Sequence, residues 1–358
     1  MSAAALLSIL CAVHFFGMWV LFVSRANNPL RAAVTSLWKI DAPELFEYVG
    51  ALVATRIWID HHWWRAVTVA FVHGSWLHAV LNLMALFVLG RAAELALGRV
   101  RMLIVFFASS VVGCLASVAV VEAPILVGAS AGIFGLGGCV AVLRRFASLS
   151  VQRSISWVRA RRLAVGLVGW IAIGFIFPLL DWMPLLAQAG HIGGLVIGTV
   201  LGAFYAQGHV QRARRYTLLL IVVMVGVCTA AAAVRPSWSP RYHLYMGYGW
   251  LDRARPAHAL RSFEAALALD PGDSALKNTV AYQRVTNGHG LDRAELLARE
   301  IVSLSPKDPN FLDTLGWIRC KQGYPKEGEI FLRRAAATVG AAEIREIAEH
   351  QRKCRLAN

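Results

Sequence analysis

The stretch Gly128-Ala129-Ser130-Ala131-Gly132 stands at the start of a short apolar segment, residues 130–143. Its small residues let a reacting group approach the serine oxygen closely. A second polar residue, His191, lies in another apolar segment, residues 187–205. Ionisable residues inside membrane spans are costly and are therefore interpreted first as functional. A serine and a histidine on two separate spans suggest peptide hydrolysis within a bilayer.

The composition favours a membrane protein over a soluble one. The chain has 358 residues, of which 57% are hydrophobic, and its mean hydropathy is +0.55. A helix needs ~20 apolar residues to cross a hydrocarbon core of ~30 Å. The net charge of +15 comes from arginines in short runs between apolar segments, which indicates cytoplasmic loops rather than a nucleic-acid surface.

The cysteines and histidines predict no cofactor. The 6 cysteines are scattered and form no CxxC motif, so we expect neither a disulfide framework nor a metal site. His61 and His62 are adjacent but lack a third ligand at a useful spacing.

Seven apolar stretches predict an all-α, polytopic bundle with six core helices and a seventh span. The first has no basic residues before it and is longer than the apolar part of a signal peptide, so we expect it to be a span. The stretches are residues 3–23, 77–97, 102–121, 130–143, 163–180, 187–205 and 216–234.

Loop charges predict the orientation of these spans. Arginines gather between spans two and three, four and five, and six and seven, whereas the alternate loops carry only Glu122 and Asp181. The basic loops should be cytoplasmic, so Ser130 should open toward the extracytoplasmic side. The short fourth span would leave an aqueous pit above the serine, because irregular backbone at that depth is tolerated where it lines a cavity.

The composition changes after residue 234, where a polar, repetitive tail begins. Leu269-Asp270-Pro271 and Leu304-Ser305-Pro306 end two similar stretches. The spacing resembles tetratricopeptide (TPR) repeats of ~34 residues; the alternative is an unspecialised helical tail. We therefore expect a protease-like core at 1–206, a basic linker and seventh helix at 207–235, and a TPR-like domain at 236–358. Such repeats form a concave surface for a peptide or partner protein.

His78 and Asn82 begin the second span and lie four residues apart, so they share one helix face. Both can donate hydrogen bonds, and in lipid such a pair should face the bundle interior. They could stabilise the oxyanion of a tetrahedral intermediate. The alternative is that both bind neighbouring helices.

Several motifs in sequence resemble the rhomboid family of intramembrane serine proteases over residues 1–205. They are Trp64-Arg65, the run from Phe71 to His78, Asn82, Gly90, Glu94, Gly128-Ala129-Ser130, and Ala189-Gly190-His191 with Gly194 and Gly198. The chain departs from many rhomboids in one place, because Ala131 rather than glycine follows the serine.

The resemblance implies a dyad of Ser130 as nucleophile and His191 as general base and then general acid, without an acidic third member. His78, Asn82 and the backbone N–H of Ser130 would hold the oxyanion, while Gly128 keeps the loop backbone open.

Further residues would support this site. Phe134 would stack on the catalytic histidine, although core packing is its alternative role. Trp64 and Arg65 would be structural in the first loop, and Glu94 would be a structural acid near the cytoplasmic end of its span. Gly194 and Gly198 belong to a glycine stripe that lets two helices approach closely.

Three functions compete. The first is an intramembrane endopeptidase that cleaves membrane proteins in or near their transmembrane segments. The second is a non-catalytic rhomboid-like protein that binds clients through its bundle and its TPR-like tail. A transporter is disfavoured because Glu94 is the only acid within a predicted span and no inverted repeat is visible. The alanine- and arginine-rich composition favours a bacterial plasma membrane.

Overall fold

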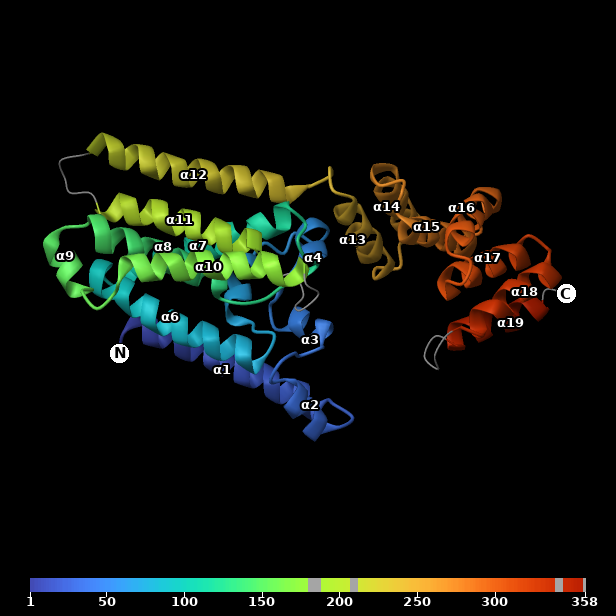
Figure 1. Cartoon of the computed structure of the whole chain (residues 1–358), viewed down its shortest axis with the longest axis horizontal. Helices are drawn as coiled ribbons and strands as arrows, with labels where there is room; N and C mark the ends of the chain where they lie inside the picture. Colours follow the sequence, from blue (N-terminus) through green and yellow to red (C-terminus); the bar gives the residue numbers. More distant parts are fainter. Residues whose placement is uncertain (180–187, 207–211, 339–343, 357–358) are drawn as a thin grey trace. The chain divides into compact units, whose positions relative to one another are not determined.

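The computed structural model describes residues 1–179, 188–206, 212–338 and 344–356. The chain divides into two compact units, Met1–Pro236 and Ser237–Asn358. Both are helical, and the expected helical membrane bundle is confirmed in the first unit (Figure 1). Asp181 and part of the linker, residues 207–211, lie outside the described residues.

The first unit contains long helices joined by short elements. In chain order these are α1 (Ala3–Ser24), α2 (Pro29–Thr35), α3 (Pro43–Tyr48), β1 (Leu52–Val53), α4 (Ala54–Trp58), α5 (Arg65–Thr68), the 3-10 turn η1 (Val69–Phe71), α6 (Trp76–Leu97), α7 (Arg99–Ala119), β2 (Ile125–Leu126), α8 (Ser130–Phe146), α9 (Leu149–Ser154), α10 (Ala160–Leu179), α11 (Gln188–Ala206) and α12 (Arg212–Val234).

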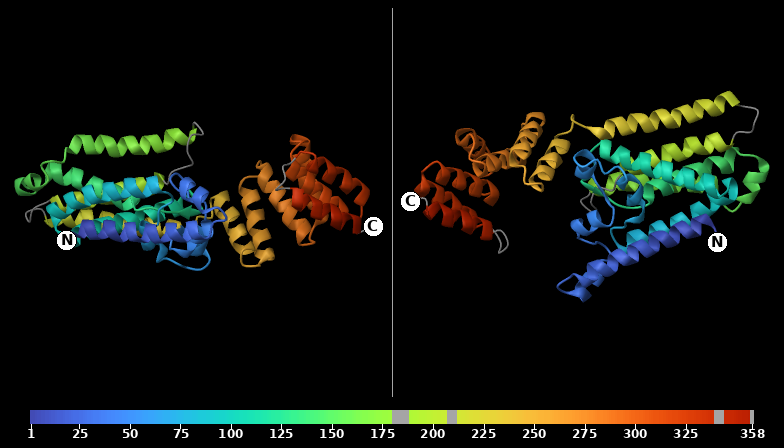
Figure 2. Two further views of the ribbon diagram at one scale, coloured as in Figure 1. Left: turned by 90° about the horizontal axis from the view of Figure 1, so that it is seen from below. Right: turned by 180° about the vertical axis from the view of Figure 1, so that it is seen from behind.

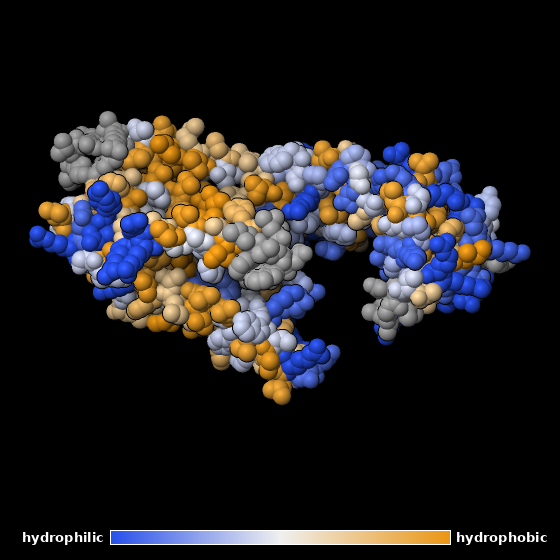
Figure 3. Space-filling model, in the orientation of Figure 1, coloured by the Kyte–Doolittle hydropathy of each residue, from blue (hydrophilic) through white to orange (hydrophobic). Residues whose placement is uncertain are grey.

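Five described helices are long and apolar enough to cross a membrane, by length and composition: α1, α6, α7, α11, and α12 over Tyr216–Val234. Their outward side chains are hydrophobic, and orange atoms cover much of this unit in Figure 3. The helix that begins at Ser130, α8, has 17 residues and is shorter than those spans.

Helix α8 packs against α6, α7, α10 and α11, and the long helices of this unit lie side by side in Figures 1 and 2. Glycines allow the closest of these contacts. A Cβ added to Gly194 or Gly198 of α11 would overlap the backbone carbonyls of Ala131 and Gly135 on α8. Small residues bring helix backbones together where lipid provides no hydrophobic driving force. The contact holds the first turns of α8 and α11 side by side.

The first loop is fastened by backbone pairing and by Arg65. Strand β1 pairs antiparallel with β2, with Leu52 opposite Leu126, so the loop is tied to the segment just before Ser130. Arg65 is only 5% exposed, and its Nη1 donates to the carbonyls of Glu47 and Ala51, both at 2.8 Å. Its guanidinium also lies 4.6 Å from the ring centre of Trp64.

The second unit is a series of amphipathic helices: α13 (Pro240–Leu251), α14 (Pro256–Leu269), α15 (Ser274–Thr286), α16 (Leu291–Leu304), α17 (Pro309–Lys321), α18 (Pro325–Ala336) and α19 (Ile344–Leu356). Proline at the first helical position and aspartate caps begin several of them. Consecutive helices pair closely where Gly247 faces Phe263 and where Gly316 faces Leu332. A core of aliphatic and aromatic side chains runs between the pairs.

The expectation that the cysteines form no disulfide is wrong for the second unit. Cys320 of α17 and Cys354 of α19 are bonded, at a sequence separation of 34. The spacing carried no short motif because the two residues meet only when their helices pack side by side. Cys11, Cys114, Cys139 and Cys228 are free.

Candidate active site

Ser130 and His191 meet where α8 and α11 begin. The Oγ of Ser130 lies 2.9 Å from Nε2 of His191, which is hydrogen-bonding distance, and the histidine is 6% exposed. The loop before Ser130 turns at Gly128, whose φ of 119° disfavours any residue with a side chain. The residues that the sequence placed on separate spans are therefore in contact.

The ring of His191 is held from one face. Phe134, one turn after Ser130 on α8, stacks on it with ring centres 4.6 Å apart and planes 18° apart. The other ring nitrogen, Nδ1, has no hydrogen-bond partner among the described residues. Among the described residues, stacking by Phe134 therefore orients His191, and no acidic side chain does so.

His78 lies against the turn that precedes the serine. A Cβ added to Gly128 would come within 2.8 Å of Cε1 and Nε2 of His78, so only glycine fits there. The N–H of Gly74 points to the other ring nitrogen, Nδ1, at 3.4 Å. His73 packs edge-on to His78 at 5.2 Å. Burial, and then the charge of His78, lower the pKa of His73 to about 3, so His73 is neutral near pH 7.

Asn82 shares a pocket with the serine. This pocket has a volume of about 280 Å³ and lies between α6, α8 and α10. Its walls are mostly apolar, and they include Ser130, Phe134 and Trp170. The Nδ2 of Asn82 donates to the carbonyl of His78 at 2.8 Å, one turn earlier on the same helix. The amide side chain is therefore held close to the serine by its own helix.

Sequence reasoning missed the role of Glu122, which it used only as a loop charge. Its Oε1 accepts hydrogen bonds from the backbone N–H groups of Gln188 at 2.6 Å and Ala189 at 3.3 Å. These belong to the first turn of α11, where N–H groups lack partners inside the helix. The carboxylate thus caps the helix that carries His191. Its signal in the sequence was an acidic residue in a loop otherwise free of charge.

Glu94 lies at the opposite end of α6 from His78. Its carboxylate oxygens accept from the backbone N–H groups of Ala3 and Ala4, at 3.2 and 3.1 Å, so it caps α1. Arg91 and Arg99 lie 3.8 and 3.5 Å from it. Glu94 is therefore remote from the serine and contacts only structural partners among the described residues.

This geometry defines a class: a multi-pass helical membrane protein with a serine and a histidine in contact inside the bundle. Comparison with known proteins points the same way. Residues 60–208 match the family model described as the Rhomboid domain.

Curated relatives carry the same family name. RHOMBOID-like protein 2 of Arabidopsis thaliana is 27% identical over 192 residues, 54% of this chain and 55% of the relative. Rhomboid protease GluP of Bacillus subtilis is 30% identical over 144 residues, 40% of this chain and 25% of the relative. Putative rhomboid protease YdcA of the same organism is 29% identical over 157 residues, 43% of this chain and 71% of the relative.

The chain thus spans about half the length of the first curated relatives it matches. The domain match and these relatives support the rhomboid family for the membrane bundle. The domain match ends at residue 208 and does not reach the second unit, so the resemblance of that unit to TPR repeats stays a prediction.

Proposed function

We propose that this protein is an intramembrane serine endopeptidase that uses Ser130 and His191 as a catalytic dyad. The observation that carries the proposal is the 2.9 Å approach of Ser130 Oγ to His191 Nε2 inside a bundle of membrane-spanning helices. A nucleophile within hydrogen-bond reach of a base that is itself oriented is the arrangement that covalent catalysis requires. The Rhomboid domain match over both residues supports it.

The reaction follows from the two atoms in contact. Nε2 of His191 accepts the proton of Ser130 as Oγ attacks the carbonyl carbon of the scissile bond. The tetrahedral intermediate collapses when the same nitrogen returns the proton to the leaving amine. Water then attacks the acyl-enzyme by the same exchange. The stacked ring of Phe134 keeps the imidazole in place through both steps.

The negative oxygen of the intermediate needs donors at a fixed position. The backbone N–H of Ser130, the ring of His78 and the amide of Asn82 would supply them. His78 lies against Gly128 and Asn82 lines the pocket with Ser130. A preorganised donor of this kind contributes about 3 kcal/mol to lowering the barrier.

The substrates would be membrane proteins cut in or near a transmembrane segment. The pocket beside Ser130 is lined mainly by apolar side chains, which suits a segment arriving from lipid. A stable helix hides its amide groups, so the scissile region must unwind to reach the serine. Small residues and helix breakers near the cleavage site would favour that unwinding.

Purified full-length protein should therefore cleave a model single-span substrate in detergent. Ser130→Ala and His191→Ala should each reduce the rate about 1,000-fold or more, because the two residues act as a unit. Ser154→Ala and His289→Ala are matched controls on exposed residues and should cleave normally. Cleavage that persists in both dyad variants would remove the assignment. If the wild-type protein cleaves none of the substrates tested, the alternative of a non-catalytic protein that binds clients is favoured.

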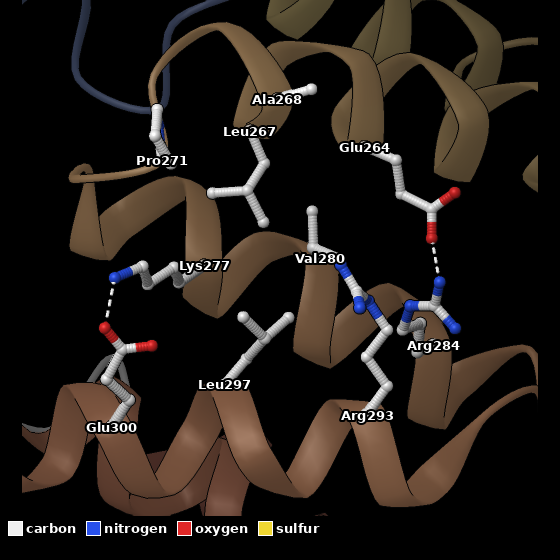
Figure 4. A pocket seen from close by; sticks show the side chains of 10 residues that line it. All are labelled: Glu264, Leu267, Ala268, Pro271, Lys277, Val280, Arg284, Arg293, Leu297 and Glu300. Atoms are coloured by element: carbon white, nitrogen blue, oxygen red, sulfur yellow. Dashed lines mark hydrogen bonds and ion pairs between the residues drawn. The ribbon is translucent and has the colours of Figure 1, made fainter.

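The second unit would add a protein or peptide partner, as its TPR-like helix pairs suggest. A pocket of about 510 Å³ lies between α14, α15 and α16, and Figure 4 shows the side chains that line it. Leu267 of α14 and Leu297 of α16 point toward each other across it, and Arg293 points into it near Arg284. Glu264 pairs with Arg284, whereas Arg293 has no carboxylate partner among the described residues. A peptide with an acidic residue next to an apolar residue would match the arginine and the leucines of this pocket.

Crosslinking in membranes gives the test for such a partner. A photoreactive group at an exposed position beside the pocket should trap a protein, and Arg293→Glu should reduce the yield several-fold by reversing the charge. An unchanged crosslinking yield would mean that the partner binds another surface.

For localisation we propose a bacterial plasma membrane, with the serine facing the extracytoplasmic side.

A further inference from the structure

The second unit is closed by a covalent bond that catalysis does not use. Helix α19 ends the described chain and packs against α17 and α18. Cys354 of α19 is bonded to Cys320 of α17. Both sulfurs are buried in the core of this unit. The bond therefore fixes the last helix to the body of the tail.

Non-covalent contacts already bring α19 into register for this bond. His350 of α19 is buried against Asp313 of α17, with Nδ1 2.9 Å from a carboxylate oxygen, and it stacks on Trp317. Tyr282 of α15 donates to Glu346 at 2.8 Å. Because these contacts place α19 without the sulfur bond, the two thiols would face each other as soon as the tail folds.

Disulfides persist in oxidising compartments and are rare in the cytosol, where thiols are kept reduced. A pair of buried cysteines in contact on adjacent helices thus reports on the side of the membrane where the tail folds. It points to the non-cytosolic side.

The end of α12 gives an independent indication of the same side. Helix α12 packs beside α11 and α7 and runs back toward the end of α11 that holds His191 (Figure 1). Near its last residue, the carbonyl of Ala233 accepts a 2.9 Å hydrogen bond from Nε1 of Trp58 on α4. Helix α4 directly follows β1, which pairs with β2 just before Ser130. The chain therefore leaves the bundle at the end where α8 and α11 begin, which is the end that holds Ser130 and His191.

From these two observations we propose that Cys320 and Cys354 are an oxidation site, closed by a thiol–disulfide oxidant on the membrane side to which Ser130 opens, and that the whole tail folds on that side. The tail and the catalytic groups then meet the same pool of proteins, so a partner bound by the tail is exposed to the serine without crossing the membrane.

The disulfide can form by thiol–disulfide exchange with a protein that carries an oxidised dithiol. While the tail is folding and its thiols are still accessible, the thiolate of one cysteine attacks the disulfide of an oxidised dithiol protein and forms a mixed disulfide. The thiolate of the second cysteine then attacks this mixed disulfide, which releases the oxidant and forms the sulfur–sulfur bond between Cys320 and Cys354. The two cysteines lose two electrons and two protons, and the oxidant leaves as its dithiol.

A thiol count on full-length protein tests the bond. Cells are quenched in acid, and the denatured protein is treated with maleimide-polyethylene glycol, which adds mass for each free thiol. Of the 6 cysteines, four are free, so four adducts are expected before reduction and six after it. Cys320→Ser and Cys354→Ser should each give five adducts in both conditions. Six adducts before reduction in the wild type would overturn the proposal.

Protease access in sealed vesicles tests the side. An added protease should degrade the tail in right-side-out vesicles and leave it protected in inverted ones. The reverse pattern would overturn the proposal even if the bond were present. Both measurements are repeated on Ser130→Ala, which should behave identically. Since neither depends on peptide cleavage, their failure is distinct from failure of the dyad.

Discussion

The membrane bundle and the tail are both helical, yet their helices are held together by different means. In the bundle, α8 and α11 touch through glycines, and Gly198 lies against the backbone of Gly135. In the tail, large side chains such as Phe263 and Leu332 pack against Gly247 and Gly316 of the neighbouring helices, with ion pairs around them and one disulfide. Lipid already solvates apolar side chains, so close backbone contact replaces hydrophobic burial in the bundle. In water the tail gains from burial instead.

The largest expected effect breaks the glycine contact of the bundle. Gly198→Ala places a methyl group against the carbonyl of Gly135, a backbone atom that cannot move aside cheaply. Overpacking of this kind costs about 2–3 kcal/mol. Thermal unfolding of the bundle should shift down and cleavage should fall. Gly17→Ala on α1 is the matched control, since no atom lies within 4 Å of its added Cβ. Equal stability of the two variants would contradict the role given to the contact.

A smaller effect sharpens the comparison by testing a polar contact within the bundle. Glu122→Gln removes the negative charge at the start of α11 and should cost about 1 kcal/mol, because a carboxylate stabilises the N-terminal end of a helix. Cleavage should slow through a lower kcat, since His191 lies in the next turn of that helix. Glu44→Gln, on an exposed acid, is the control. Restored activity in Glu122→Asp would indicate that the charge matters, and an unchanged kcat in Glu122→Gln would remove the positioning role.

The smallest effect concerns the ion pairs of the tail, where Arg319 lies between Glu295 and Glu327. Burial opposes ionisation of Glu295, but hydrogen bonds from Arg299 and Gln322 outweigh it and lower its pKa. A hydrogen bond from Arg319 lowers the pKa of Glu327.

Carboxyls with a lowered pKa in the folded state stabilise it above their ordinary value of 4.5, and this contribution is lost as the pH falls through the folded pKa. The unfolding temperature of the tail should thus decrease on acidification below about pH 4.5. In Glu295→Gln with Glu327→Gln the decrease should be smaller by a few degrees. Parallel curves for the variant and the wild type would show that these pairs contribute nothing.

Much of the bundle could be predicted because lipid imposes a simple rule on the sequence. The apolar run at residues 3–23 becomes α1, and the run at 77–97 becomes α6. The serine was expected at the start of a short helix, and α8 begins at Ser130. Gly194 and Gly198 were expected to let two helices approach closely, and in the structure they lie against the backbone of α8. The chemistry assigned to Ser130, His191, His78 and Asn82 stays a prediction until cleavage is measured.

Other features had no local pattern to reveal them. Glu122 caps α11 although it is far from that helix in the chain. Cys320 and Cys354 carry no motif spacing, and Trp58 reaches Ala233 across the fold. Each of these contacts joins segments that are far apart in the chain, so the spacing of residues within either segment could not reveal it.

The sequence by itself determined that apolar helices cross a membrane, that a polar helical tail follows them, and which glycines lie near the serine and the histidine. These are properties of residue type and spacing, which act along the chain. Only the tertiary structure decided that Ser130 touches His191, that Glu122 caps the helix of that histidine, and that two distant cysteines bond. Such contacts depend on how whole helices pack, and packing is determined by the sum of many weak interactions across the fold.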